Sequence, residues 1–262
     1  MAALQIHQFE CLSDNYGVLI HDSEAGLTAS IDAPEEAAVQ KALDDTGWTL
    51  THILVTHHHA DHTQGISGLK QKFGAHVIGP KAESSKIPTL DDTVGGGDIF
   101  QFGGFTVRVY DTPGHTLGQV NFHLPDAFAE GKGVAFTGDT LFALGCGRVF
   151  EGTHAMMWQS MQTLLGNLPA DTVIYCGHEY TLANAKFALS VDPDNGALQE
   201  RAAEIEALRA AGKPTLPTTM ARELATNPFL RPDDAGIQAH LGMTGAPLGE
   251  IFSEIRSRKD RF

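Results

Sequence analysis

The most informative stretch of the chain is Thr56-His57-His58-His59-Ala60-Asp61-His62. It follows a short apolar run at 52–56, whose β-branched content and length predict a strand. His57 and His59 are two residues apart, so their side chains can point to the same side of an extended or turning backbone. Imidazole nitrogens and carboxylate oxygens are ligands that zinc and similar divalent metals prefer. The stretch therefore predicts a metal site rather than a histidine-rich surface loop.

Three further segments place a metal-capable side chain just after an apolar run and beside a glycine. Residues 107–116 contain Gly114-His115, residues 134–140 contain Gly138-Asp139, and residues 173–179 contain Gly177-His178. Glycine permits a tight turn and a close backbone approach, and sites in layered α/β folds collect at such strand ends. Each segment alone is more typical of an ordinary turn. Together, the four segments supply more ligands than one tetrahedral ion needs and enough for two.

Composition narrows the class of protein. The chain has 262 residues and is 42% hydrophobic, which is enough to bury a sizeable core. Its 18 basic and 32 acidic residues give a net charge of −14, which disfavours binding to nucleic acid. No apolar run approaches the roughly 20 residues of a membrane-spanning helix. We therefore expect no nucleic-acid partner and no membrane association.

The N-terminal residues and the cysteines are typical of a protein of the cytoplasm. The N-terminus lacks the basic flank and apolar run of a signal peptide. Cys11, Cys146 and Cys176 are odd in number and lack metal-finger spacing, which is typical of free thiols in a reducing environment. A cytoplasmic protein is the expectation.

The pattern along the chain predicts an α/β fold with a helical extension. Apolar runs predict strands at 17–20, 52–56, 105–110, 134–137 and 172–176, and helices are expected at 35–46, 65–73 and 154–165. After residue 179 the pattern becomes helical, with helices expected at 197–211, from Thr218 or Thr219 toward 225, from 232 onward, and at 247–258. We predict a metal-binding hydrolase domain over residues 1–178 and a smaller helical domain over residues 179–262.

These motifs resemble those of the metallo-β-lactamase superfamily of binuclear hydrolases. More narrowly, the chain resembles glyoxalase II, also called hydroxyacylglutathione hydrolase, in segments 56–62, 138–142, 145–148, 150–153 and 176–181. The resemblance extends from 12–16 to Arg256 and Lys259, essentially the whole chain. It implies an αββα sandwich followed by a smaller C-terminal α-helical domain, which binds glutathione.

The resemblance also implies a ligand set. One divalent metal would be held by His57, His59 and His115, a second by Asp61, His62 and His178, and Asp139 would bridge them. Zinc is expected first, with iron or manganese as alternatives. Asp61 would also orient the bridging hydroxide, so Asp61 and Asp139 are the candidate catalytic residues. His58 is not a ligand in the family pattern, and we expect it to support the site from outside.

The implied substrate is S-D-lactoylglutathione, cleaved to D-lactate and glutathione by a monomeric enzyme. Arg148, Tyr180, Arg256 and Lys259 match family positions that bind glutathione. Without the resemblance, the basic C-terminus would be assigned to a solvated helix end that complements its own dipole. Phe150 stands where animal members have a tyrosine, and one lost neutral hydrogen bond costs about 0.5–1.5 kcal/mol.

Other functions are open at this point. A persulfide dioxygenase, a lactonase or a β-lactamase of the same superfamily would share part of the metal motif. A further alternative from a different class is a binding module that is stabilised by metal and catalyses no reaction. The presence of a metal-capable residue at all seven ligand positions argues against it. A cysteine hydrolase would use Cys146 or Cys176, although Cys176 follows an apolar run and is more typical of a small buried side chain.

Overall fold

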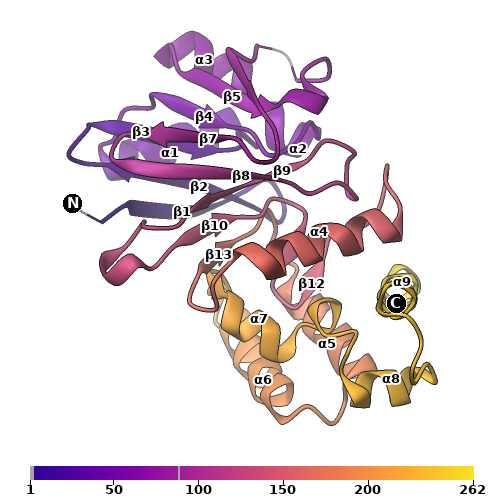
Figure 1. Cartoon of the computed structure of the whole chain (residues 1–262). Coiled ribbons are helices and arrows are strands. Elements are labelled where there is room, and N and C mark those ends of the chain that lie inside the picture. Colours follow the sequence, from indigo (N-terminus) through magenta and orange to yellow (C-terminus); the bar gives the residue numbers. More distant parts are fainter. Residues whose placement is uncertain (1–2, 88) are drawn as a thin grey trace.

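The computed structural model describes residues 3–87 and 89–262, and most of its strands form two stacked sheets (Figure 1). The first sheet has the strand order β1-β2-β3-β4-β5-β6. β1 to β3 pair antiparallel and β3 to β6 pair parallel, with Ile31 opposite Leu54 and Leu54 opposite Ile78. Its strands are β1 Gln5–Cys11, β2 Asn15–Asp22, β3 Leu27–Ile31, β4 His52–Leu54, β5 His76–Pro80 and β6 Asp92–Val94.

The second sheet has the order β14-β13-β10-β9-β8-β7. Neighbouring strands are antiparallel except for β10 and β13, so β8, β10 and β13 all run in the same direction. Its strands are β7 Ile99–Phe102, β8 Phe105–Asp111, β9 Val120–Leu124, β10 Val134–Phe136, β13 Val173–Tyr175 and β14 Thr218–Thr219. A separate hairpin consists of β11 Leu141–Phe142 and β12 Gly145–Cys146.

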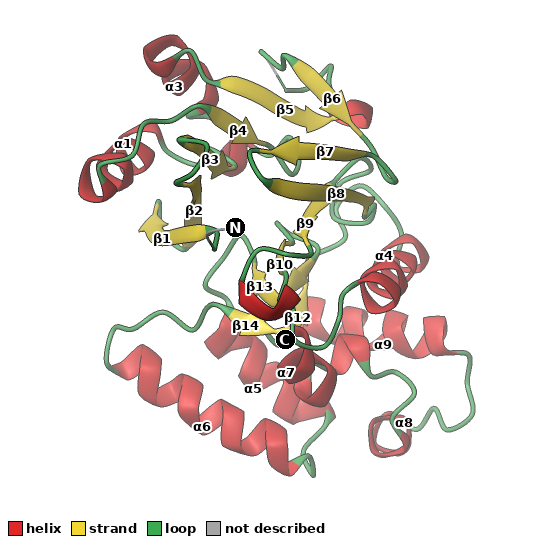
Figure 2. Cartoon of the chain, turned by 60° about the vertical axis from the view of Figure 1, so that its left-hand side comes forward, coloured by secondary structure: helices red, strands yellow, loops and turns green. Residues whose placement is uncertain are grey.

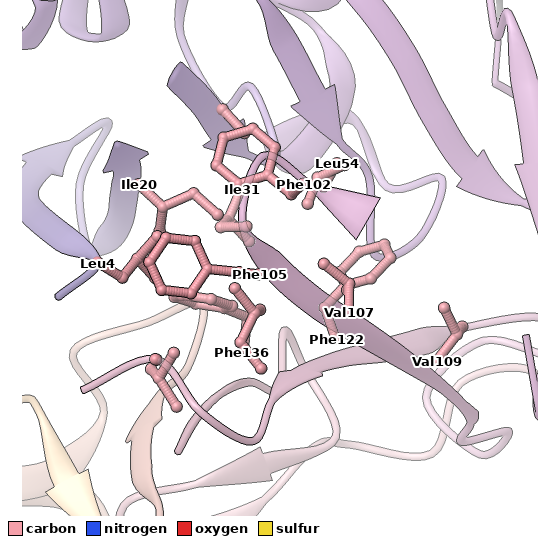
Figure 3. Close-up of a cluster of buried hydrophobic side chains, with 14 of the residues drawn as sticks. Leu4, Ile20, Ile31, Leu54, Phe102, Phe105, Val107, Val109, Phe122 and Phe136 are labelled. Carbon is pink, nitrogen blue, oxygen red and sulfur yellow. The ribbon is translucent and has the colours of Figure 1, made fainter. Parts of the chain in front are cut away.

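Alternation along the strands builds the layers, because successive side chains point to opposite faces of a sheet. Ile20, Leu54 and Phe136 belong to the apolar layer between the two sheets, which Figure 3 shows in close-up. Their neighbours Leu19 and Ala135 belong to separate clusters on the outer faces. The helices α1 Glu36–Thr46 and α3 Ile66–Phe73 cover the first sheet, and α4 His154–Asn167 covers the second. The predicted αββα sandwich is therefore confirmed.

The predicted C-terminal helical part is also confirmed, and its helices gather on one side of the sandwich (Figure 2). The one strand in it, β14, extends the second sheet by pairing with β13, which the helical pattern did not predict. None of the described helices is both long and apolar enough to cross a membrane. The helices are α5 Thr181–Val191, α6 Gly196–Ala210, α7 Met220–Thr226, α8 Ala235–Leu241 and α9 Leu248–Arg261.

Most expected elements form with small changes at their ends. The strand expected at 52–56 ends at Leu54, because the chain leaves the sheet to present the histidines that follow. Thr219 caps α7 by accepting from the Arg222 backbone, as expected for one of the two candidate threonines. Asp234 caps α8 in the same way, through the backbone N–H groups of Gly236 and Ile237. The strands β1, β3, β5, β6, β7 and β9 and the β11–β12 hairpin were not predicted.

A buried ion pair joins the helical part to the β11–β12 hairpin. Arg201 of α6 donates to Glu223 of α7, and both side chains are almost fully buried. The second oxygen of the Glu223 carboxylate accepts the backbone N–H of Leu144 at 2.8 Å, in the hairpin turn. Asn227 Nδ2 donates to the carbonyl oxygens of Phe142 and Gly145 at 3.2 and 3.0 Å. The helical part therefore holds the hairpin by polar contacts as well as by packing.

We predict that Glu223→Ala lowers the free energy of unfolding by about 3–5 kcal/mol, because Arg201 would be left buried without its counter-ion. The matched control is Glu204→Ala, which breaks the solvent-exposed pair between Glu204 and Arg222. That change should cost only about 0–1 kcal/mol. Urea unfolding followed by circular dichroism measures both. Equal losses in the two variants would contradict a structural role for the buried pair.

Candidate metal centre

The residues of the predicted metal site lie at the ends of strands from both sheets. The segment after β4 carries His57 and His59 and leads into the short helix α2, Ala60–Thr63. His115, Asp139 and His178 follow β8, β10 and β13, whose common direction brings their carboxyl ends to one edge. The structure therefore brings all seven predicted ligands together, although they span more than a hundred positions of the sequence.

The first group contains His57, His59 and His115. His59 Nδ1 lies 3.2 Å from His57 Nε2 and 3.0 Å from His115 Nε2, and all three nitrogens could reach a common ion. Burial and the neighbouring histidines hold the pKa of each of the three imidazoles below its ordinary value. When three neutral imidazoles point nitrogens at one another, at least one nitrogen lone pair has no N–H donor to accept from. A bound cation would accept the lone pairs of all three nitrogens.

The second group contains Asp61, His62 and His178. His178 Nε2 lies 3.4 Å from both His62 Nε2 and Asp61 Oδ2. Burial opposes the charged form of His62, but the carboxylates of Asp139 and Asp32 outweigh it and raise the pKa of His62 well above its ordinary value. The group therefore sits in a field that favours positive charge, and a metal ion can supply that charge in place of a proton.

Asp139 lies between the two groups. Its Oδ2 is 3.3 Å from His115 Nε2 of the first group and 3.3 Å from His178 Nε2 of the second. No described residue makes a hydrogen bond to its buried Oδ1, although His62 Nε2 lies 3.3 Å away. The surrounding imidazoles hold the pKa of Asp139 well below its usual range, despite its burial. A fully buried carboxylate with a free oxygen fits a position between two cations.

Outer partners fix the rings of four of the histidines through the nitrogen that faces away from the cluster. None of these contacts was predicted from the sequence. In metal sites, such contacts hold the ligands in the required tautomer and orientation. The partners are Thr56 Oγ1 for His57 at 3.0 Å, Asp32 for His62 at 2.7 Å, the Arg148 carbonyl for His115 at 2.8 Å and Asp14 for His178 at 3.1 Å.

Asp32 is the most important residue that the sequence analysis missed. It lies directly after β3 in the left-handed region, with φ 56°, and it is buried. Its carboxylate accepts from the backbone N–H and the hydroxyl of Thr56 at 2.7 and 2.8 Å, besides contacting His62. Its signal in the sequence was an acidic residue at the end of an apolar run. The same kind of signal had identified Asp139.

His58 points away from the two groups. Its Nδ1 lies 2.9 Å from Glu83 and its Nε2 lies 3.4 Å from Glu151. Glu83 also accepts the backbone N–H of Gly118 at 3.0 Å, and Glu151 accepts that of Leu117 at 3.1 Å. These contacts link His58 to the loop that carries His115, as expected for a residue that supports the site from outside.

The four predicted glutathione-binding residues differ in their contacts and in their burial. The Tyr180 ring stacks on His178 with centroids 4.7 Å apart, and it is half-exposed. Lys259 donates to the Ala183 carbonyl in α5 at 3.2 Å, and burial lowers its pKa to about 8. Arg148 is exposed, whereas Arg256 is buried against Cys146 and donates to its carbonyl at 2.9 Å.

Phe150 contacts both Arg148 and two histidines of the first metal group. Its ring centroid is 5.3 Å from that of His115 and 6.0 Å from that of His59. The guanidinium of Arg148 lies over the ring, 5.4 Å from the centroid. The side chain is 61% exposed, so an apolar ring next to His59 and His115 is accessible from outside.

Comparisons with known proteins agree with this geometry. Residues 24–178 match the family model described as metallo-beta-lactamase superfamily, and residues 179–262 match the one described as hydroxyacylglutathione hydrolase C-terminus. The chain is 60% identical over 259 residues to a hydroxyacylglutathione hydrolase of Brucella anthropi, covering 99% of this chain and 97% of that protein. It is 59% identical to the Brucella abortus protein of the same name, covering 99% and 98%.

Solved structures share the fold at lower sequence identity. ETHE1 from Myxococcus xanthus has a TM-score of 0.65 at 24% identity, covering 97% of this chain and 98% of that one. TTHA1623, solved in a di-iron-bound form, has a TM-score of 0.58 at 22% identity, covering 86% and 98%. The fold and its His/Asp groups are those of a divalent-metal-binding protein. The match of both parts of the chain shows that it belongs to the hydroxyacylglutathione hydrolase family, within the metallo-beta-lactamase superfamily.

Proposed function

We propose that this enzyme is a binuclear-metal thioesterase that hydrolyses S-(2-hydroxyacyl)glutathione, chiefly S-D-lactoylglutathione, to D-lactate and glutathione. The observation that carries the proposal is the pairing of two adjoining His/Asp groups with a basic site on α9, in a chain of this family. S-D-lactoylglutathione is formed from methylglyoxal and glutathione. Its hydrolysis would therefore serve the detoxification of methylglyoxal.

Two metal ions are proposed, with zinc ahead of iron or manganese. His57, His59 and His115 would hold one ion, Asp61, His62 and His178 the other, and the Asp139 carboxylate would contact both. When bound, such a pair supplies Lewis-acid chemistry and makes water a nucleophile near neutral pH. The orphaned oxygen of Asp139 and the neutral, converging imidazoles of the first group support this assignment.

The residues of the chain orient the reacting groups. Asn15 Nδ2 donates to Asp61 Oδ2 at 3.1 Å and so fixes the carboxylate that we propose to orient the attacking water. The leaving group is a thiolate, whose conjugate acid has a pKa of about 8.5 in an unperturbed cysteine. It can depart without a proton donor, whereas an amide nitrogen generally needs one. The described site contains no dedicated acid, which favours a thioester over an amide.

A cysteine nucleophile is disfavoured by the burial of all three thiols. Burial raises the pKa of Cys146 to about 11 and that of Cys176 to about 12, so both are protonated near neutral pH. The three cysteines are unpaired, which supports the proposed cytoplasmic location. A monomer is proposed because one chain supplies every proposed ligand and substrate cation.

The direct test is loss of the thioester absorbance of S-D-lactoylglutathione with purified, metal-loaded protein. We expect rapid hydrolysis that a chelator abolishes and added zinc restores. Two metal ions per chain, measured by elemental analysis, should accompany full activity. Absence of hydrolysis by protein with two ions bound would refute the substrate, and persulfides and lactones would then be assayed.

Removing Asp139 and removing Asp32 should have graded effects. Asp139→Ala takes away the carboxylate between the two groups, so we expect loss of metal and of nearly all turnover. Asp32→Asn keeps every ligand but weakens the support of His62, so we expect metal affinity to fall about 10–100-fold. Metal content after dialysis and turnover at saturating zinc measure both. Full metal content and normal turnover in Asp139→Ala would contradict the bridging role.

The double variant Arg256→Ala with Lys259→Ala should raise KM for S-D-lactoylglutathione at least about ten-fold, with a much smaller effect on kcat. Hydrogen bonds to charged groups contribute about 1.5–3 kcal/mol each, and these residues are proposed to bind a glutathione carboxylate. The matched control is Arg258→Ala with Arg261→Ala, which removes two cations from the same helix. Its KM should change less than about two-fold. An equal change in both double variants would indicate a long-range charge effect instead.

A further inference from the structure

A single carboxylate of α9 lies between two of the proposed substrate-binding cations. Asp260 Oδ1 accepts from Arg256 Nη2 at 2.9 Å and lies 3.9 Å from Arg148 Nε. Its side chain is 27% exposed, so it is only partly solvated. Nothing in the sequence analysis or in the proposed reaction assigns a role to this residue.

Each guanidinium nitrogen of Arg256 is either paired within the chain or buried. Nη1 donates to the Cys146 carbonyl at 2.9 Å, and the guanidinium lies over the Phe229 ring, 5.2 Å from its centroid. Nε is buried and has no hydrogen-bond partner among the described residues. Nη2, which Asp260 occupies, is therefore the remaining donor by which Arg256 can meet a carboxylate from outside.

Arg148, the second cation, also has Asp260 as its nearest carboxylate. Asp260 is the acidic residue that the structure places beside the exposed Arg148, whose guanidinium is otherwise held over Phe150. Phe150 in turn contacts His59 and His115. A series of contacts through Phe150 and Arg148 thus connects His59 and His115 to Asp260 on α9.

We propose that Asp260 is an internal counter-ion that occupies the position of the substrate carboxylate, so that it limits the affinity for glutathione thioesters. This inference rests on the proposed function, because it takes the bound molecule to be a glutathione thioester. A substrate carboxylate must displace Asp260 from Arg256 or share Nη2 with it, and two carboxylates at one donor repel each other. The contacts of Arg256 with Cys146 and Phe229 remain when Asp260 is displaced.

The test is the neutral, nearly isosteric variant Asp260→Asn. We expect KM for S-D-lactoylglutathione to fall about three- to five-fold, and the inhibition constant of the product glutathione to fall by a similar factor. The matched control is Glu254→Gln, which removes one negative charge from the same helix but pairs with Arg258 instead. Its KM should stay at the wild-type value.

A substrate without the carboxylate separates competition from a structural effect. S-D-lactoyl-N-acetylcysteamine carries the same thioester but no glutathione carboxylate, so its kcat/KM should be the same in wild type and in Asp260→Asn. If the asparagine variant fails to fold, Asp260→Ser removes the same charge. An unchanged or raised KM for the glutathione thioester in a folded neutral variant would overturn the inference, as would an equal change with both substrates. Failure of the wild type to hydrolyse any glutathione thioester would instead refute the proposed function.

Discussion

The structure depends on one electrostatic constraint, which is the buried carboxylate of Asp139 at the edge where the two sheets meet. A carboxylate removed from water is stable only if positive charge or hydrogen-bond donors face it. Here imidazoles from three different segments surround it, and one of its oxygens still has no hydrogen bond from the described residues. The strand ends, the tight glycine turns and the outer partners all serve to bring these groups to one point.

The outer partners explain how the rings hold their directions. Asp32 and Asp14 contact His62 and His178 through the nitrogens that face away from the cluster, so the opposite nitrogens point inward. The first group is supported by neutral acceptors, the Thr56 hydroxyl and the Arg148 carbonyl. The second group therefore lies in the more negative field, which agrees with the opposite directions of the histidine pKa shifts in the two groups.

The helical part of the chain does more than cover the sandwich. It adds β14 to the second sheet and holds the β11–β12 hairpin through Glu223 and Asn227. That hairpin follows Asp139, and its Cys146 carbonyl receives the guanidinium of Arg256 from α9. The proposed metal site and the proposed glutathione site therefore both contact the β11–β12 hairpin. We therefore expect a substitution that displaces this hairpin to affect both sites.

The sequence by itself determined the layered α/β class and the helical C-terminal part, and it predicted the seven proposed ligand positions, because each of these depends on local patterns. Apolar runs of strand length, and a histidine or aspartate beside a turn glycine at their ends, can be recognised without knowing what lies next to them. Short strands such as β6 and β14 were not predicted, because two or three residues are too few to show a periodic pattern. Only the tertiary structure decided that Asp32 supports His62, that Arg256 is buried on the Cys146 carbonyl and that Asp260 lies between two cations. Apart from the pair Arg256–Asp260, which lies within α9, those contacts join residues that are distant in sequence and lie on different elements, and no local pattern encodes which of them will meet.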